Sequence, residues 1–192
     1  MPLKRRQIGQ FEVLSCQKWL DEGFEHGSIG RPWNFAFSGF EESKQKLKSS
    51  FGIDDVLYLK QVHGAGVVNA LKWAGQPTDG DAFIAPVQGN TRPIMLTIRS
   101  ADCLPLWIRS DRVVALAHAG WKGLATGIIQ TTVAELRRID GRAQFKCLIG
   151  PAASPERYEV GQEVVTACSP YGDCRPGPSG KYSMNLAGTA LN

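Results

Sequence analysis

The stretch LPLWIRSDRVVALAHAGWKGL, residues 104–124, decides the fold. It contains two apolar runs, LPLWI at 104–108 and RVVALAH at 112–118, that have the length and composition of β-strands. Between them lies the dipeptide Ser110-Asp111, whose two residue types are common in turns. The sequence therefore predicts a β-hairpin over these two runs.

A helix is expected to follow the glycine turn at residues 120–123. Apolar side chains recur at helical spacing beyond this turn, and Gly141 is suited to end the helix. The spaced residues are Ala125, Ile129, Val133 and Leu136. The order of strand, tight turn and helix would place residues of the turn near the free amide groups at the start of the helix.

The rest of the chain contains further short apolar runs and two helical patterns. Strands are expected at 56–62, 66–68, 81–85, 93–98 and 145–150. Helices are expected at 38–52, where Ser38 and Glu41 form a capping-box pattern, and at 161–169. Strands outnumber helices without alternating strictly with them. This favours an α/β fold of α+β character, with a mixed β-sheet and flanking helices in one domain over residues 1–192, rather than a doubly wound fold.

The composition is that of an ordinary globular protein. Of the 192 residues, 43% are hydrophobic and 21% are charged, which argues against disorder. The net charge of +4 is too mild for a nucleic-acid-binding stripe.

The sequence shows no targeting segment. A membrane span needs about 18 consecutive apolar residues, which no window approaches, and no export signal is visible. The five cysteines lack disulfide spacing, so we expect reduced thiols in a cytoplasmic protein that binds neither nucleic acid nor membrane.

Three residues that can bind metals occupy similar places in the pattern. His63 ends a predicted strand, Cys103 lies between two predicted strands, and His118 ends the second strand of the hairpin. Two imidazoles and one thiolate suit Zn²⁺, and three protein ligands leave a fourth position open, as in catalytic zinc sites. Their spacing is not that of a zinc finger. Taken singly, a histidine at a strand end is more often a hydrogen-bonded structural residue, and a lone cysteine in an apolar stretch is more often a packing residue.

Asp102 and Lys122 are candidates for catalytic roles beside these ligands. Lys122 lies in the glycine turn, where it would add positive charge to an anion site; the alternative is that the glycines only permit a tight turn. Asp102 adjoins Cys103 and could orient a ligand, act as a general base toward water, or cap the backbone of its own turn.

The other histidine, two further aspartates and the other cysteines are expected to have structural roles. Turn positions are expected for His26, Asp79 and Asp81, core positions for Cys16, Cys147 and Cys168, and a loop position for Cys174.

Several segments occur in the order seen in one known family. They are QVHG (61–64), DGDAFIA (79–85), SADCLPLWI (100–108), AHAGWKGL (117–124) and IGPAASPERYEVGQEV (149–164). PWNFAF at 32–37 also resembles an earlier strand of that family, so the likeness covers roughly residues 24–186. On these motifs the chain resembles the laccase-domain family, also called the multicopper polyphenol oxidase or zinc-dependent purine nucleoside phosphorylase family.

The resemblance implies a single α/β domain whose metal is bound by His63, Cys103 and His118. It also implies phosphorolysis of adenosine, inosine, guanosine and methylthioadenosine, together with deamination of adenosine. The partners would then be purine nucleosides and phosphate, and we expect a monomer or a homodimer.

The sequence departs from the usual pattern of that family at several places. Lys122 stands where the family usually has Arg, and Glu156-Arg157 stands where it usually has a pair of cysteines. Asn185 replaces the usual Asp. The family usually continues with a further basic, aromatic segment, which this sequence lacks after Asn192. Because Lys has no bidentate fork, phosphate would be held differently here.

Three other functions remain open from the sequence. Copper-dependent phenol oxidation could place Cu²⁺ on the same three ligands, although the chain lacks the several His-x-His pairs of a multicopper centre. A non-catalytic metal- or nucleoside-binding protein would keep the site without turnover. A cysteine hydrolase would use Cys103 as nucleophile with a histidine as its base.

Overall fold

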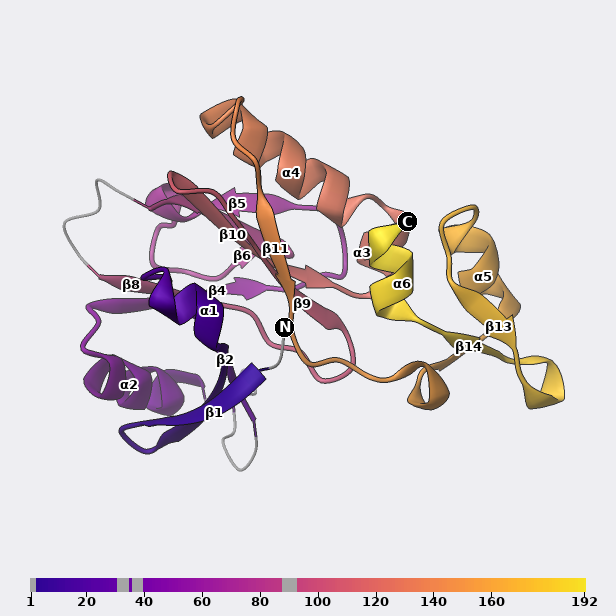
Figure 1. The fold of residues 1–192 in the computed structure, drawn as a ribbon, viewed down its shortest axis with the longest axis horizontal. Helices are drawn as coiled ribbons and strands as arrows, with labels where there is room; N and C mark the ends of the chain where they lie inside the picture. The colour runs from indigo at the N-terminus through magenta and orange to yellow at the C-terminus, as the bar shows by residue number, and fades with distance from the viewer. Residues whose placement is uncertain (1–2, 31–34, 36–39, 88–92) are drawn as a thin grey trace. The chain divides into compact units, whose positions relative to one another are not determined.

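The fold combines helices with several small β-sheets (Figure 1). The computed structural model describes residues 3–30, 35, 40–87 and 93–192. The predicted cap Ser38, and most of the segment 32–37, lie outside these residues. Contacts divide the chain into two compact units, Met1–Val56 with Arg92–Met95 and Leu57–Thr91 with Leu96–Asn192. Each is described separately, and the expected single domain over residues 1–192 stays a prediction.

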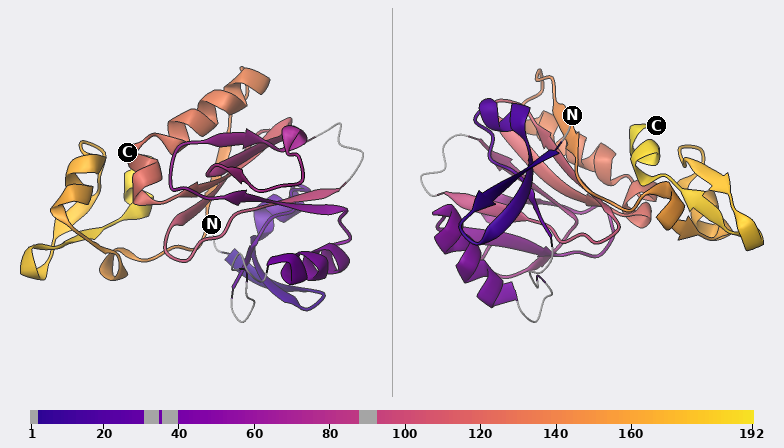
Figure 2. Two further views of the ribbon diagram at one scale, coloured as in Figure 1. Left: turned by 180° about the vertical axis from the view of Figure 1, so that it is seen from behind. Right: turned by 60° about the horizontal axis from the view of Figure 1, so that its bottom comes forward.

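The first unit is built on a small antiparallel sheet in the order β1-β2-β3. Its elements are β1 (Leu3–Ile8), β2 (Phe11–Cys16), α1 (Gln17–Asp21), β3 (Ser28–Ile29) and α2 (Phe40–Phe51). The rings of Phe11 and Phe51 have centroids 6.1 Å apart, which joins α2 to the hairpin, and Figure 2 shows the helix beside it. Contact between the buried ring of Phe11 and the partly buried ring of Phe51 contributes to the packing of this unit.

His26, which was predicted as a turn residue, lies in the irregular segment between α1 and β3, and its side chain is buried and hydrogen-bonded. Its side chain is 9% exposed, and its ring stacks on that of Phe24 with centroids 5.6 Å apart. Its Nε2 accepts a hydrogen bond of 2.9 Å from the backbone N–H of Cys16, and its Nδ1 lies 2.9 Å from the carbonyl oxygen of Phe24. Both ring nitrogens are therefore occupied by backbone groups.

The second unit is organised around a mixed sheet in the order β11-β9-β10-β7-β5. Its strands are β5 (Val67–Asn69), β7 (Ala82–Pro86), β9 (Leu104–Arg109), β10 (Val113–Ala119) and β11 (Lys146–Ile149). The predicted hairpin is confirmed, since β9 and β10 pair antiparallel with His118 opposite Pro105. β5 runs parallel to β7, whereas the other pairs are antiparallel. The α/β class with a mixed sheet is thereby confirmed.

The other elements form two further sheets and four helices. One sheet has the order β6-β4-β8, from β4 (Asp55–Lys60), β6 (Thr78–Asp79) and β8 (Ile94–Thr97). The other has the order β12-β14-β13, from β12 (Glu159–Val160), β13 (Cys174–Pro176) and β14 (Tyr182–Met184). The helices are α3 (Trp121–Ala125), α4 (Ile128–Ile139), α5 (Gln162–Cys168) and α6 (Leu186–Leu191). Short 3₁₀ turns lie at Ala70–Lys72, Pro155–Arg157 and Pro178–Gly180.

Among the described residues, no helix has both the length and the apolar character required to cross a membrane.

Alternation along β9 places its apolar side chains in the core of the second unit. Leu104 and Leu106 belong to a cluster with residues of α5 and α6, and Ile108 belongs to a second cluster with Leu136 of α4. α4 packs against β10, β7 and β5. Successive residues of a strand face opposite sides, so His118 points away from the face that carries its neighbours Ala117 and Ala119.

The single helix predicted after the glycine turn is interrupted. α3 ends at Ala125 and α4 begins at Ile128, because Gly127 adopts a left-handed backbone with φ of 87°. The break shifts the buried face, which consists of Ile128, Thr132 and Leu136. Of the residues expected on that face, Leu136 is buried and Ala125 is exposed.

We expect Gly127→Ala to destabilise the protein by about 1–2 kcal/mol, the usual cost of left-handed backbone for a residue with a Cβ. The new Cβ would lie 3.5 Å from the nearest atom, the Gln130 side-chain oxygen, so steric crowding adds little. The measurement is the unfolding midpoint in urea. Gly127→Asn should lose less, because asparagine tolerates this conformation. Equal stability of Gly127→Ala and the unaltered protein would contradict the prediction.

Candidate metal centre

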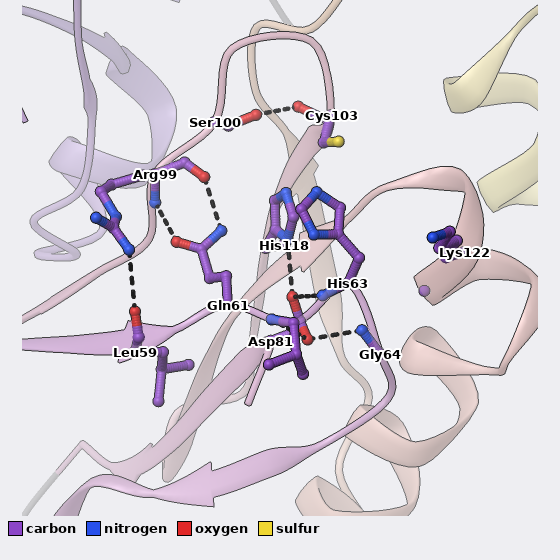
Figure 3. Close-up of polar contacts among 12 residues, drawn as sticks. Leu59, Gln61, His63, Gly64, Asp81, Arg99, Ser100, Cys103, His118 and Lys122 are labelled. Atoms are coloured by element: carbon purple, nitrogen blue, oxygen red, sulfur yellow. Dashed lines mark hydrogen bonds and ion pairs between the residues drawn. The ribbon is translucent and has the colours of Figure 1, made fainter. Parts of the chain in front are cut away.

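Three donor side chains from separate segments converge within the second unit. One donor atom from each of His63, Cys103 and His118 lies within 4.8 Å of the other two. The imidazole rings have centroids 4.9 Å apart in an edge-to-face arrangement, and Figure 3 shows the Cys103 thiol beside them. The structure thus brings together the three residues selected from the sequence, as a group that could hold a metal ion.

The hairpin brings two of these donors to one end of the sheet. In the antiparallel register of β9 and β10, His118 lies opposite Pro105. Cys103 precedes Pro105 by two residues, just before β9 begins, so its thiol is carried to the same end. The third donor, His63, comes from the turn that follows β4. Strand β10 therefore carries His118, the bend just before β9 carries Cys103, and the turn after β4 carries His63.

His118 is buried and bonded to a carboxylate. Its side chain is 3% exposed, and its Nδ1 lies 2.9 Å from Oδ1 of Asp81, which is completely buried. Burial lowers the pKa of His118, although the hydrogen bond to Asp81 opposes this effect. The lowered pKa favours the neutral imidazole, which is the form that binds metals.

His63 lies in a turn rather than at a strand end. β4 ends at Lys60, so the strand predicted to reach Val62 is shorter than expected. His63 has a left-handed backbone with φ of 59°, which is uncommon for a residue other than glycine. Its backbone N–H donates a hydrogen bond of 3.0 Å to Asp81 Oδ1, as Figure 3 shows.

The Gln61 side chain ties the segment that carries His63 to the segment that carries Cys103. Its Nε2 donates to the carbonyl oxygen of Arg99 at 2.7 Å, and its Oε1 accepts from the N–H of Arg99 at 2.8 Å. The Ser100 hydroxyl then donates to the carbonyl oxygen of Cys103. These contacts, drawn in Figure 3, give both donor segments a common support.

Cys103 is half-buried, and its surroundings disfavour the ionised thiolate. Burial raises the pKa of Cys103, and the neighbouring carboxylates of Asp102 and Asp81 raise it further. Nucleophilic cysteines have a lowered pKa because a positive charge or a metal stabilises their thiolate. The electrostatics of the protein alone therefore do not favour a cysteine hydrolase.

Gly120 allows the backbone to approach the donors closely. Its φ of −78° and ψ of 170° are available to any residue, so its backbone does not require glycine. A Cβ at this position would lie 2.8 Å from Cys103 Sγ and 3.3 Å from His63 Cδ2. The glycine in AHAGWKGL is therefore explained by the space that the donors occupy.

Asp81 is the residue of the site that the sequence analysis missed. It was expected in a turn like Asp79, which is exposed but ends strand β6 rather than lying in a turn. The structure buries Asp81 completely and surrounds its carboxylate with donors. The available signal was its position directly before the buried run AFIA at 82–85, where an ionised side chain needs partners.

The two residues proposed as catalytic lie outside the donor group. Lys122 is exposed on α3, and its Nζ lies 5.5 Å from the centroid of the Trp121 ring. Asp102 is exposed, and its backbone carbonyl accepts a hydrogen bond of 3.0 Å from Ala153. Its charge acts on Cys103 and on Tyr158, whose pKa is raised to about 12 by burial and by both neighbours. The Tyr158 hydroxyl therefore stays protonated near the donors, a feature that the sequence did not indicate.

The remaining cysteines are only partly as expected. Cys16 and Cys168 are buried, as predicted, but Cys147 is exposed on β11, and Cys174 begins β13 rather than lying in a loop. All five cysteines belong to the described part of the chain and carry free thiols.

Two surface hollows lie away from the donors. One, of about 420 Å³, is lined by the β9–β10 turn and the segment before β11. The other, of about 640 Å³, is lined by parts of α4, β11 and α6. Neither hollow is lined by His63, Cys103 or His118. The chemistry of the donor group, rather than the size of a hollow, identifies the candidate site.

Comparison with known proteins finds relatives that are named as purine nucleoside phosphorylases. A purine nucleoside phosphorylase of Deinococcus radiodurans is 36% identical over 129 residues, which cover 65% of this chain and 49% of the relative. Purine nucleoside phosphorylase YfiH of Escherichia coli is 35% identical over 130 residues, which cover 66% of this chain and 51% of the relative. The chain thus spans about half the length of the curated relatives it matches.

Two solved structures share the fold. YlmD from Geobacillus stearothermophilus has a TM-score of 0.78 and 22% identity, covering 99% of this chain and 82% of that one. A hypothetical protein YfiH of Bacillus licheniformis has a TM-score of 0.77 and 20% identity, and the match covers 96% of this chain and 80% of that one.

Residues 38–192 match the family model described as multi-copper polyphenol oxidoreductase laccase. The chain therefore belongs to the multi-copper polyphenol oxidoreductase laccase family.

Proposed function

We propose that the chain is a zinc-dependent purine nucleoside phosphorylase with adenosine deaminase activity. The observation that supports this proposal most strongly is the group of His63, Cys103 and His118. One donor atom from each of these residues lies within 4.8 Å of the other two. Two nitrogens and one sulfur suit Zn²⁺, and a set of three leaves one coordination position for substrate or water. The names of the curated relatives supply the substrate class.

In this proposal the three donors hold the ion, and the residues around them bind and orient the reactants. Phosphorolysis transfers the ribosyl group from the purine to phosphate, so the site must hold an anion beside the nucleoside. We assign phosphate to Lys122, a cation that is exposed on α3 and follows His118 by four residues in the chain. When bound, Zn²⁺ supplies Lewis-acid polarisation of an oxygen atom.

Deamination of adenosine requires water in place of phosphate. Asp102 is the assigned general base, because its carboxylate is exposed and adjoins Cys103 in the chain. A base of this kind takes a proton from water as the water attacks the purine, and ammonia then leaves. The two reactions would share the donor group and differ in the residue that handles the second reactant.

The activity is tested by incubating the zinc-loaded protein with phosphate and a panel of adenosine, inosine, guanosine and methylthioadenosine. Chromatography should show free purine bases and ribose 1-phosphate or its methylthio analogue. Inosine from adenosine should form even without phosphate. If the protein binds nucleosides in calorimetry yet forms no product, it is a binding protein and the enzymatic proposal fails.

Lys122→Ala is expected to lower phosphorolysis about tenfold or more, because a charge-assisted hydrogen bond to an anion contributes about 1.5–3 kcal/mol. Deamination and zinc binding should change less, since neither uses phosphate. Lys122→Arg keeps the charge and should preserve phosphorolysis. The rates of both reactions are compared with those of Lys72→Ala, an exposed lysine elsewhere in the unit. Equal losses in both reactions, or no loss in either, would remove Lys122 from the phosphate site.

A second candidate, copper-dependent phenol oxidation, is suggested by the description of the family. The donor group could hold one copper ion, because imidazole and thiolate also suit that metal. The chain contains three histidines, and His26 already has backbone partners at both ring nitrogens. Two histidines are too few for the several paired histidines of a multicopper centre. Metal analysis of protein purified without added metal, together with an assay of phenol oxidation, separates the two candidates.

A further inference from the structure

We propose that Asp81 is a positioning residue that orients both histidines of the donor group toward a metal ion. It would act on His118 through the imidazole ring and on His63 through the backbone. The inference rests on the proposed metal site and concerns how that site is held in shape before the ion arrives.

The contact with His118 decides which ring nitrogen is free to bind. Asp81 Oδ1 lies 2.9 Å from His118 Nδ1, and both side chains are buried. A carboxylate only accepts hydrogen bonds, so Nδ1 must carry the ring proton. The lone pair of the neutral ring is then on Nε2, the nitrogen that remains for the donor group.

The same carboxylate holds the turn that carries His63. Three successive backbone N–H groups converge on it: those of Val62, His63 and Gly64 donate at 3.3, 3.0 and 2.7 Å. Such convergence of amide groups forms a concave site for an anion. It stabilises the left-handed backbone of His63, which directs that side chain beside His118 (Figure 3).

All four hydrogen bonds require a carboxylate, because each oxygen accepts two of them. An asparagine offers one acceptor oxygen and turns an NH₂ group toward donors. The backbone contacts of residue 81 do not depend on its side chain: its N–H donates to Gly66, and its carbonyl accepts from the N–H of His118. Asp81→Asn is therefore a selective test of the carboxylate.

The first experiment is nitrogen-15 NMR of the histidine rings in the unaltered, metal-free protein. The proton of the neutral His118 ring is expected on Nδ1, with Nε2 unprotonated. The opposite tautomer would overturn the proposal. This measurement needs neither a variant nor bound metal, so it remains decisive if a substituted protein fails to fold.

The second experiment compares zinc affinities by competition with a chromophoric chelator. Asp81→Asn is expected to bind Zn²⁺ about 10–100-fold more weakly, the usual effect of removing a group that orients a metal ligand. Asp79→Asn is the matched control: that side chain is 65% exposed, pairs with Lys60 at 3.3 Å and should leave the affinity unchanged. Unchanged affinity in a folded Asp81→Asn protein would overturn the proposal, whereas failure of the unaltered protein to bind zinc would overturn the metal site itself.

Discussion

Cys103→Ala is expected to lose bound zinc and nucleoside turnover while the protein stays folded. The substitution removes the thiol, the one sulfur among the three donors that converge within 4.8 Å. Loss of a group that only supports a ligand weakens metal binding about 10–100-fold, so loss of a ligand itself should exceed about 100-fold. Cys103 is half-buried just before β9, and truncating its side chain should cost at most about 1 kcal/mol of folding stability.

The measurements are metal content by mass spectrometry, nucleoside turnover, and the urea unfolding midpoint. Cys147→Ala is the matched control, because Cys147 is an exposed thiol on β11 and is not among the donors. It should keep both metal and activity. If Cys103→Ala retains zinc and turnover, Cys103 is a packing residue and the proposed ligand set is wrong.

Gly120→Ala is expected to weaken zinc binding at least about tenfold, the lower end of the effect of disturbing ligand geometry. The backbone of Gly120 suits any residue, so alanine would introduce no conformational strain. Its Cβ would instead lie 2.8 Å from Cys103 Sγ and 3.3 Å from His63 Cδ2. One or both donors must move to make room, which separates them from the arrangement that a single ion needs.

Zinc affinity by chelator competition and the intensity of the Co²⁺–thiolate absorption band measure this effect. Gly30→Ala serves as the control, because a Cβ there would lie more than 4 Å from the atoms of the residues that the structure describes. An alanine at position 120 that leaves both the affinity and the band unchanged would show that the donors tolerate a methyl group beside them. The role assigned to this glycine would then be wrong.

Much of the fold and the identity of the donors could be read from the sequence. The runs at 104–108 and 112–118 are short, apolar and separated by turn residues, and such local patterns specify a hairpin without help from the rest of the chain. His63, Cys103 and His118 could be selected because each was predicted beside the end of a strand, and together they supply the nitrogen and sulfur donors of a zinc site. Two imidazoles and one thiolate suit Zn²⁺ but also copper, so their chemistry indicates a metal site without deciding which metal it holds.

Several local features were predicted incorrectly because tertiary packing outweighed local propensity. Apolar spacing from Ala125 to Leu136 predicts one helix, yet Gly127 breaks it so that Ile128 can enter the core. The strand expected to reach Val62 ends at Lys60, because the amide groups that follow turn toward Asp81 instead of continuing a ladder. In each case a partner distant in sequence offers a better contact than the local one.

The sequence by itself indicated the α/β class and the hairpin and singled out the three candidate donors, since these depend on periodicity, turn chemistry and side-chain type. Only the tertiary structure decided that Asp81 belongs to the site. Its bonds reach Gly64 and His118, which lie on either side of it in the chain, and its residue type alone equally fits an exposed turn. A buried carboxylate acquires its partners through folding, because only the folded chain brings enough N–H groups together to replace the water that the charge has lost.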